Sequence, residues 1–354
     1  MNPYILFILL FGLGLGTTIT FASSHWLLAW MGLEINTLAI IPLMAQSHNP
    51  RAVEASTKYF LTQATAAAML LFASTTNAWL TGQWNIDHMS HPFPTTLIIL
   101  ALALKIGLAP FHSWLPEVLQ GLDLTTGMIL STWQKLAPFS LLLQLHITET
   151  TQVIPGLIIF LGVTSLLVGG FGGLNEVQLR KLLAYSSIAH MGWMVTIKMY
   201  CPQLTFFALC IYILMNCATF LTLSVNQVTT TKKMAVFWPF SPGLAVTACF
   251  LLLSLGGLPP LTGFMSKWLI LQELAKQELG MLATISALTA LLSLFYYLRL
   301  SYAVALTISP DNLSGTAPWR LQPRQLSTPL AVFTTASLML LPITPSVFTL
   351  FTLK

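Results

Sequence analysis

Three ionisable side chains lie deep inside long apolar segments, where a charge is costly. Lys105 lies in LALALKIGLAPFHSW, Lys135 in STWQKLAPF and Glu34 in WMGLEINTL. Each is about ten residues from the end of its segment, or ~15 Å at 1.5 Å per residue, which is near the bilayer midplane. One such group costs roughly 2.5–3.5 kcal/mol on insertion scales. We therefore expect the three to face one another or water, as in a proton or ion pathway.

Lys267, in TGFMSKWLI, and two histidines extend this polar set. Glu273 and Lys276 mark a helix end within two turns of Lys267, so snorkelling to the surface is one interpretation. Its place just after a Gly/Pro break favours a functional role. His112 and His190 are candidate proton relays because histidine exchanges protons near neutral pH, although a single histidine among apolar residues is more often a packing residue.

The composition is that of a polytopic membrane protein. The 354 residues are 55% hydrophobic and 7% charged, whereas soluble domains carry about 25% charged residues. An apolar helix of roughly 20 residues crosses the hydrocarbon, and the sequence lacks the short alternating segments of a membrane barrel. We predict an all-α fold of about eleven transmembrane helices near 3–22, 26–46, 57–80, 96–120, 125–146, 153–171, 177–198, 203–225, 243–272, 280–306 and 328–350.

The basic residues divide unequally between the two faces that these spans imply. The face of the N-terminus holds Arg51, Lys58, Arg180, Lys181, Lys232, Lys233, Arg299, Arg320 and Arg324, and the other face holds Lys198, Lys276 and Lys354. This bias predicts an N-terminus in the cytoplasm or the mitochondrial matrix. The basic residues are scattered over many loops, so no nucleic-acid partner is expected.

A helix-breaking stretch occurs twice. GLAPFHSW at 107–114 contains Gly107 and Pro110, and its loose repeat GLPPLTGF at 257–264 contains Pro259 and Pro260. Each lies in the fourth helix of a five-helix block. Because five is an odd number of membrane crossings, the second block enters the membrane from the opposite side. The sequence therefore predicts an inverted repeat around a transport pathway. The expected parts are 1–150, with its broken helix at 96–120; 151–307, with its broken helix at 243–272; and 308–354, a loop and a C-terminal transmembrane helix.

The cysteines offer no cofactor site. The four of them form neither a CxxC pair nor a CxxCH haem motif, so we expect no bound metal and no cofactor in this chain, and no electron transfer through it.

At these residues the sequence resembles the NADH dehydrogenase subunit 2 family, antiporter-like proton-pumping membrane subunits of respiratory complex I. The resemblance covers essentially the whole chain. Its most specific stretches are SSHWLLAWMGLEINTLAIIPLM, KYFLTQATAAAMLLF, LKIGLAPFHSWLPEVLQG, TWQKLAP, GGLNEVQLRKLLAYSSIAHMGW and SLGGLPPLTGFMSKW.

The resemblance implies a function and a set of roles. The subunit would move protons from the matrix to the intermembrane space, coupled to NADH oxidation and ubiquinone reduction elsewhere in the complex, and would thus be part of an enzyme without doing redox chemistry itself. The roles fall on the membrane glutamate Glu34, the broken-helix lysine Lys105, the next-helix lysine Lys135, the central-axis histidine His190, the second-half lysine Lys267 and, as an accessory, His112.

The resemblance also implies the cofactors of the complex, the neighbouring subunits and the cellular location. NADH, FMN, iron–sulfur clusters and ubiquinone would be bound by other subunits, and the neighbours would be subunits 4L and 4, accessory subunits and lipids including cardiolipin. The location would be the mitochondrial inner membrane, with the N-terminus in the matrix. Bacterial members have about fourteen helices, so eleven corresponds to the shortened animal form.

Two other functions stay open on the residues. One is a self-contained cation/proton antiporter. The other is a non-pumping scaffold in which Glu34 and Lys105 form a structural pair, although such a pair leaves Lys135 unexplained.

Overall fold

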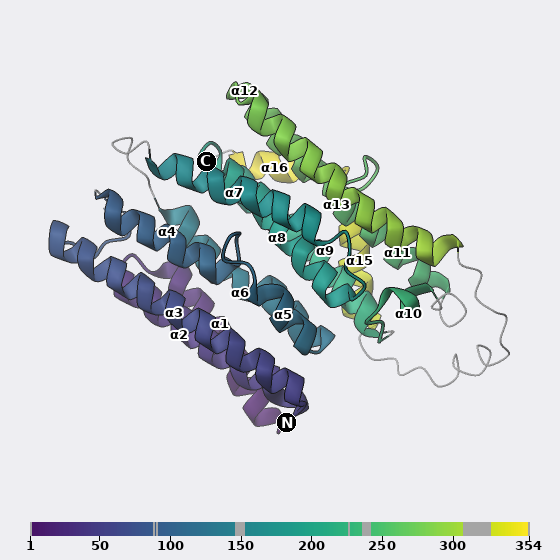
Figure 1. Cartoon of the computed structure of the whole chain (residues 1–354), viewed down its shortest axis with the longest axis horizontal. Helices are drawn as coiled ribbons and strands as arrows, with labels where there is room; N and C mark the ends of the chain where they lie inside the picture. The colour runs from purple at the N-terminus through teal and green to yellow at the C-terminus, as the bar shows by residue number, and fades with distance from the viewer. Residues whose placement is uncertain are drawn as a thin grey trace. The chain divides into compact units, whose positions relative to one another are not determined.

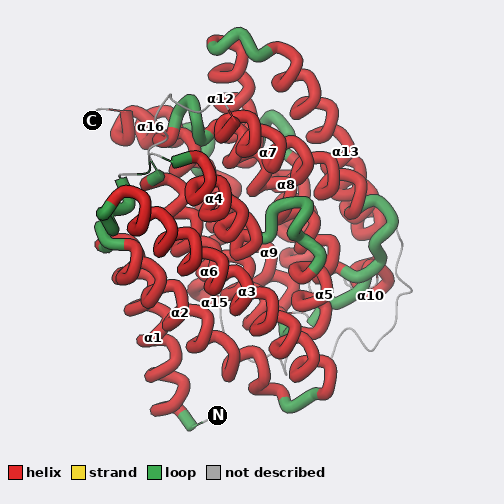
Figure 2. Tube along the Cα trace, turned by 60° about the vertical axis from the view of Figure 1, so that its left-hand side comes forward, coloured by secondary structure: helices red, strands yellow, loops and turns green. Residues whose placement is uncertain are grey.

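A computed structural model describes residues 2–87, 89, 91–145, 153–225, 227–235, 242–306 and 327–352. Over these ranges the chain forms helices joined by loops, without a β-strand (Figure 2). Two isolated β-bridges, His25 to Asn85 and Gln178 to Thr230, tie loops together. The predicted all-α class is confirmed.

The chain divides into two compact units, Met1–Ser165 and Leu166–Lys354, and each is described by itself. In the first unit α1 packs on α2, α3 packs on α2, α4 and α5, and α6 packs on α1, α2 and α4 (Figure 1). The helices of this unit are α1 (Pro3–Ala22), α2 (Trp26–Met44), the short 3₁₀ helix η1 (Ala45–Ser47), α3 (Pro50–Thr81), α4 (Pro92–Ile106), α5 (Trp114–Gly121), α6 (Leu124–Gln144) and most of α7 (Val153–Gly172).

In the second unit α9 packs against α8, α11, α12 and α15, while α13 packs along α11 and α12. Its helices after the end of α7 are α8 (Leu179–Ile197), α9 (Pro202–Val225), α10 (Thr231–Ala235), α11 (Pro242–Gly256), α12 (Thr262–Lys276), α13 (Gly280–Leu306), α15 (Ser327–Met339) and α16 (Thr344–Thr352).

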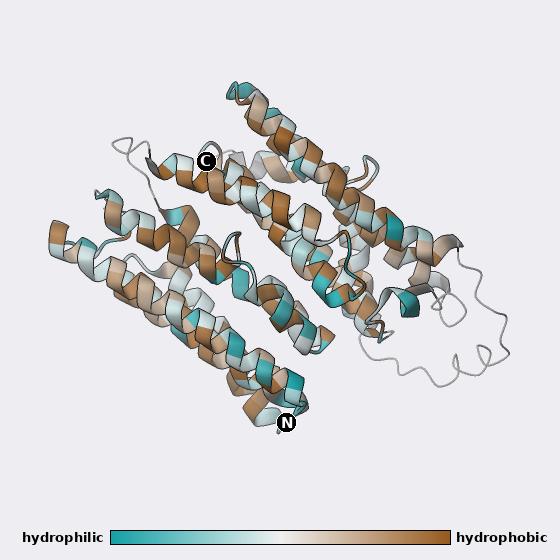
Figure 3. Cartoon of the chain, viewed as in Figure 1, coloured by the Kyte–Doolittle hydropathy of each residue, from teal (hydrophilic) through white to brown (hydrophobic). Residues whose placement is uncertain are grey.

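Hydrophobic residues run along most of the length of the helices, and hydrophilic ones gather at places such as α10 (Figure 3). Within the described ranges, five helices are long and apolar enough to cross a membrane: Pro3–Ala22, Trp26–Met44, Ile154–Gly172, Pro202–Val225 and Gly280–Ala305. Three shorter helices are also apolar: Pro92–Ile106, Gly243–Gly256 and Thr328–Met339. All eight overlap predicted spans, and Pro92–Ile106 and Gly243–Gly256 are the first parts of the two predicted broken helices.

The structure differs from the predicted spans mainly near the C-terminus. The expected helix at 328–350 is two helices, α15 and α16, because Pro342 lacks the amide hydrogen that would continue α15 and Pro345 suits the first turn of α16. Helix α3 begins at Pro50 rather than near 57, again with proline in its first turn. The short helix α10 was not predicted.

Candidate functional site

The first predicted helix break separates α4 from α5. Gly107 has φ +85°, a left-handed conformation that favours glycine. Its N–H and that of Leu108 both donate to the carbonyl oxygen of Ala103, at 2.9 Å each. These bonds end α4 as a glycine-capped helix, and Pro110 lies within the following turn. The break therefore falls where Gly107 and Pro110 predicted it.

The second break separates α11 from α12 and has the same cap. Gly257 has φ +82°, and the N–H groups of Gly257 and Leu258 donate to the carbonyl oxygen of Leu253 at 3.1 and 3.3 Å. Pro259 and Pro260 lie in the turn before α12. The similarity of GLAPFHSW and GLPPLTGF thus reflects a similar backbone.

The two buried lysines of the first unit share a cavity. Lys105, in the last turn of α4, is 5% exposed, and Lys135, on α6, is 2% exposed. Both line a small cavity between α2, α3, α4 and α6. The Nζ atom of Lys105 has no hydrogen-bond partner within the described ranges. The structure therefore places Lys105 and Lys135 at one cavity.

Glu34 is close to this cavity but does not line it. Its carboxylate lies within electrostatic range of Lys105, yet no ion pair joins the two side chains in the described structure. The nearest polar partner is Thr37, whose hydroxyl donates to the Glu34 carbonyl at 2.9 Å and lies 3.4 Å from Oε2. A direct Glu34–Lys105 ion pair, the alternative considered above, is therefore not formed in this conformation.

Three neutral amides, Asn36, Gln63 and Gln134, lie in the cavity wall together with apolar and hydroxyl side chains. The Nε2 atom of Gln134, on α6, donates to Asn36 of α2 twice, at 3.1 Å to the backbone oxygen and 3.2 Å to Oδ1. The hydroxyl of Tyr59, on α3, lies 3.5 Å from Gln134 Oε1. Gln63, one turn further along α3, also lines the cavity. We did not predict these residues; the only sequence signal is that Gln134 directly precedes Lys135.

In the second unit Lys267 bonds to the break itself. The side chain is 7% exposed, and its Nζ donates to the carbonyl oxygens of Gly256 at 2.8 Å and Leu255 at 3.3 Å. A Cβ added to Gly257 would lie 3.0 Å from this Nζ, so glycine leaves the space that the lysine needs. Lys267 therefore does not snorkel. It also lines a mainly apolar cavity of about 530 Å³ with Trp193 and Trp268.

The two histidines have different surroundings. His190, on α8, is buried, and its ring centroid lies 5.6 Å from that of Tyr212 on α9. His112, in the first break, is half-buried, and its Nδ1 lies 3.2 Å from the carbonyl oxygen of Pro110. His112 is not among the residues that line the Lys105 cavity.

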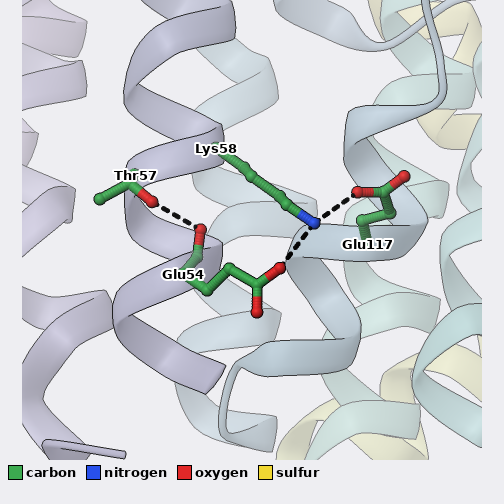
Figure 4. Close-up of polar contacts among 4 residues, drawn as sticks. All are labelled: Glu54, Thr57, Lys58 and Glu117. Carbon is green, nitrogen blue, oxygen red and sulfur yellow. Dashed lines mark hydrogen bonds and ion pairs between the residues drawn. The ribbon is translucent and has the colours of Figure 1, made fainter. Parts of the chain in front are cut away.

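An exposed ionic cluster joins α3 to α5 (Figure 4). The Nζ atom of Lys58 lies 2.8 Å from Glu54 Oε1 and 2.9 Å from Glu117 Oε2. The three side chains are 44%, 63% and 54% exposed. They line an open polar cavity of about 440 Å³ with Arg51.

We expect Lys58→Met to leave the assembly and activity of the protein unchanged. Exposed ion pairs add little to the free energy of unfolding, because water screens the charges and ordering the long side chains costs entropy. The measurement is the thermal unfolding midpoint of the assembled protein at low and high salt. A clear, salt-sensitive fall in that midpoint would show that the cluster fixes α5 on α3.

Two family models together match residues 23–348. NADH:quinone oxidoreductase/Mrp antiporter, TM matches residues 23–293, and NADH dehydrogenase subunit 2 C-terminus matches residues 294–348. Full-length relatives named NADH-ubiquinone oxidoreductase chain 2 include that of Carassius auratus, 66% identical over 99% of this chain and 100% of the relative. That of Danio rerio is 62% identical over the same shares.

Solved structures give the same fold. A chain of respiratory complex I from Thermus thermophilus is 28% identical with a TM-score of 0.79, covering 96% of this chain and 80% of that one. A chain of the Mrp complex from Dietzia sp. is 16% identical with a TM-score of 0.82, covering 95% of this chain and 74% of that one. At 16% identity the second comparison supports the fold alone.

Proposed function

Because the chain belongs to the NADH-ubiquinone oxidoreductase chain 2 family, we propose that its buried lysines carry protons across the membrane. The chain is a proton-translocating membrane subunit of respiratory complex I, and the enzyme activity, NADH:ubiquinone oxidoreduction, belongs to the complex. The observation that carries the site assignment is the buried Lys105 ammonium, which shares a cavity with Lys135 and has no partner within the described ranges.

Lys105 is the proposed switchable proton site, and Glu34 sets its affinity. Desolvation disfavours the ammonium form, whereas a nearby carboxylate favours it. Two charges ~4 Å apart interact by ~4 kcal/mol at an effective dielectric of 20, enough to change the protonation of a buried lysine. Glu34 lies outside the cavity in this conformation. A movement of its carboxylate towards Lys105 would load the lysine, and its withdrawal would release the proton.

The proposed route continues by Lys135 and His190 to Lys267, with His112 as an accessory relay. Support comes from the chemistry of each place: Lys135 lines the Lys105 cavity, His190 is buried beside Tyr212, and Lys267 is bonded to the second break. Water bonded to backbone carbonyls that the helix breaks leave free is the proposed link between these residues.

The rest of the setting is proposed on the family. NADH, FMN, iron–sulfur clusters and ubiquinone are bound in other subunits, and subunits 4L and 4, accessory subunits and cardiolipin contact this one. The location is the mitochondrial inner membrane, which the vertebrate relatives support, with the N-terminus in the matrix, which the excess of basic residues supports. The parts 1–150 and 151–307 are proposed as inverted repeats, which the matching caps at Gly107 and Gly257 support.

The test is Lys105→Met in the assembled complex, with NADH oxidation and proton pumping measured together. We expect fewer protons pumped per NADH oxidised, because methionine keeps the bulk of lysine but cannot hold a proton. Glu34→Gln should lower the turnover rate. The matched control is the exposed Lys58→Met, for which pumping should equal that of the unaltered complex. Normal pumping in Lys105→Met would overturn the site and favour a scaffold.

The antiporter alternative has a separate test. Co-fractionation of the chain with NADH dehydrogenase activity supports the complex I subunit, whereas ion exchange by the isolated chain in vesicles would support a self-contained antiporter.

A further inference from the structure

The cavity between Lys105 and Lys135 has room for one water molecule. The volume open to the centre of a water molecule is about 10 Å³. A buried water needs roughly 10–15 Å³ by this measure. Gln63, Gln134 and Asn36 line the cavity with the two lysines, and apolar side chains such as Leu33 and Leu130 line the rest. A space of this size with two to four polar partners can hold one water molecule.

Two hydrogen-bond donors of this wall lack acceptors. Lys105 Nζ and Gln63 Nε2 are the unpartnered atoms, and their side chains are 5% and 3% exposed. Two donors cannot bond to each other, and leaving them unpaired at this depth is costly. The Nε2 atom of Gln134, in the same wall, already donates its hydrogen bonds to Asn36. Lys105 and Gln63 therefore need an acceptor that the cavity can admit.

We propose that Gln63 positions one water molecule that accepts hydrogen bonds from both Gln63 Nε2 and Lys105 Nζ. A water oxygen has two lone pairs, one for each donor. The inference rests on the proposed proton route and adds a residue to it. Gln63 is a positioning residue: its amide neither gains nor loses a proton, so it holds the water without competing for the charge.

The transfer step balances. As an N–H bond of the Lys105 ammonium breaks, the water oxygen gains that proton and passes one of its own to the neutral amine of Lys135. The products are a neutral Lys105 amine, an intact water and a Lys135 ammonium. Both lysines line the cavity that holds the water.

The direct test is a structure of the assembled complex with resolved waters. We expect one water peak within about 3.2 Å of both Lys105 Nζ and Gln63 Nε2, and its loss in Gln63→Leu. An empty cavity in the unaltered complex, or a direct protein acceptor for Gln63 Nε2, would overturn the proposal.

The functional test compares Gln63→Leu with a buried control on the same helix. We expect NADH-driven pumping about tenfold slower, as for a lost hydrogen bond in a charged network. Gln63→Asn keeps an amide and leaves space for water, so it should retain more activity than Gln63→Leu. The control is Ser74→Ala, because the Ser74 hydroxyl bonds only to its own helix, at 2.8 Å to the Leu71 carbonyl.

The outcomes separate this inference from the proposed function. If Lys105→Met stops pumping and Gln63→Leu leaves it normal, Gln63 has no positioning role but the lysine route stands. If Lys105→Met pumps normally, the route itself fails. If Gln63→Leu does not assemble, the proposal is still tested by the activity of Gln63→Asn and by the water peak in the unaltered complex.

Discussion

Gly263→Ala is expected to prevent the chain from accumulating in assembled complex I. Gly263 is the second residue of α12, where an added Cβ would overlap the carbonyl oxygen of Ser254 on α11 and lie 3.1 Å from the sulfur of Met215 on α9. Main-chain atoms of a packed helix cannot turn aside as a flexible side chain would. The overlap should cost roughly 3 kcal/mol, the upper end for overpacking a core.

The matched control is Gly243→Ala, which makes the same change at the second residue of α11. No atom lies within 4 Å of the Cβ that would be added there, and alanine favours a helix over glycine by about 1 kcal/mol. The measurement is the amount of the chain in the complex on native gels, with its thermal unfolding midpoint. Equal amounts and midpoints for the two variants would show that α11 and α12 do not pack as described.

The helices and their breaks were predictable because their signals are local. A run of apolar residues predicts a span, and Gly107 followed by Pro110 predicts a break whatever packs around it. The C-terminal segment carried the same kind of signal in Pro342 and Pro345, but its overall hydropathy suggested one helix. The α3 boundary was wrong because Arg51 and Glu54 look like loop residues in sequence, whereas they lie in the exposed first turns of the helix.

The candidate site was predictable in depth but not in partners. Burial of Lys105 and Lys135 follows from their distance to the ends of apolar segments. What each charge contacts depends on the rotation of its helix and on its neighbours, so the separation of Glu34 from the cavity was not foreseen. Gln63 was missed because a neutral amide in an apolar segment carries no strong signal.

Lys267→Met is expected to impair both assembly and pumping, unlike Lys105→Met, which should impair pumping alone. The difference lies in how each break satisfies its free carbonyls. At the first break the indole Nε1 of Trp114 donates to the Leu104 carbonyl at 3.1 Å, which leaves Lys105 uncommitted. The corresponding position of the second break is Phe264, which has no donor, and there Lys267 itself bonds to the carbonyls of Leu255 and Gly256.

Methionine at position 267 would leave the carbonyls of Leu255 and Gly256 without this donor at membrane depth. Each buried acceptor left unpaired costs roughly 1–3 kcal/mol, and no lipid group replaces the bond. The cation also offsets the negative end of the α11 dipole. We therefore expect less assembled complex, measured on native gels, as well as fewer protons per NADH oxidised.

Lys267→Arg separates the structural part from proton transfer. Arginine keeps the charge and the donors, and the adjoining cavity of about 530 Å³ leaves room for its larger head group, but a guanidinium does not release its proton. The expected result is normal assembly with reduced pumping. Normal assembly of Lys267→Met would show that the break does not need the Lys267 bonds, and normal pumping by Lys267→Arg would remove Lys267 from the proton route.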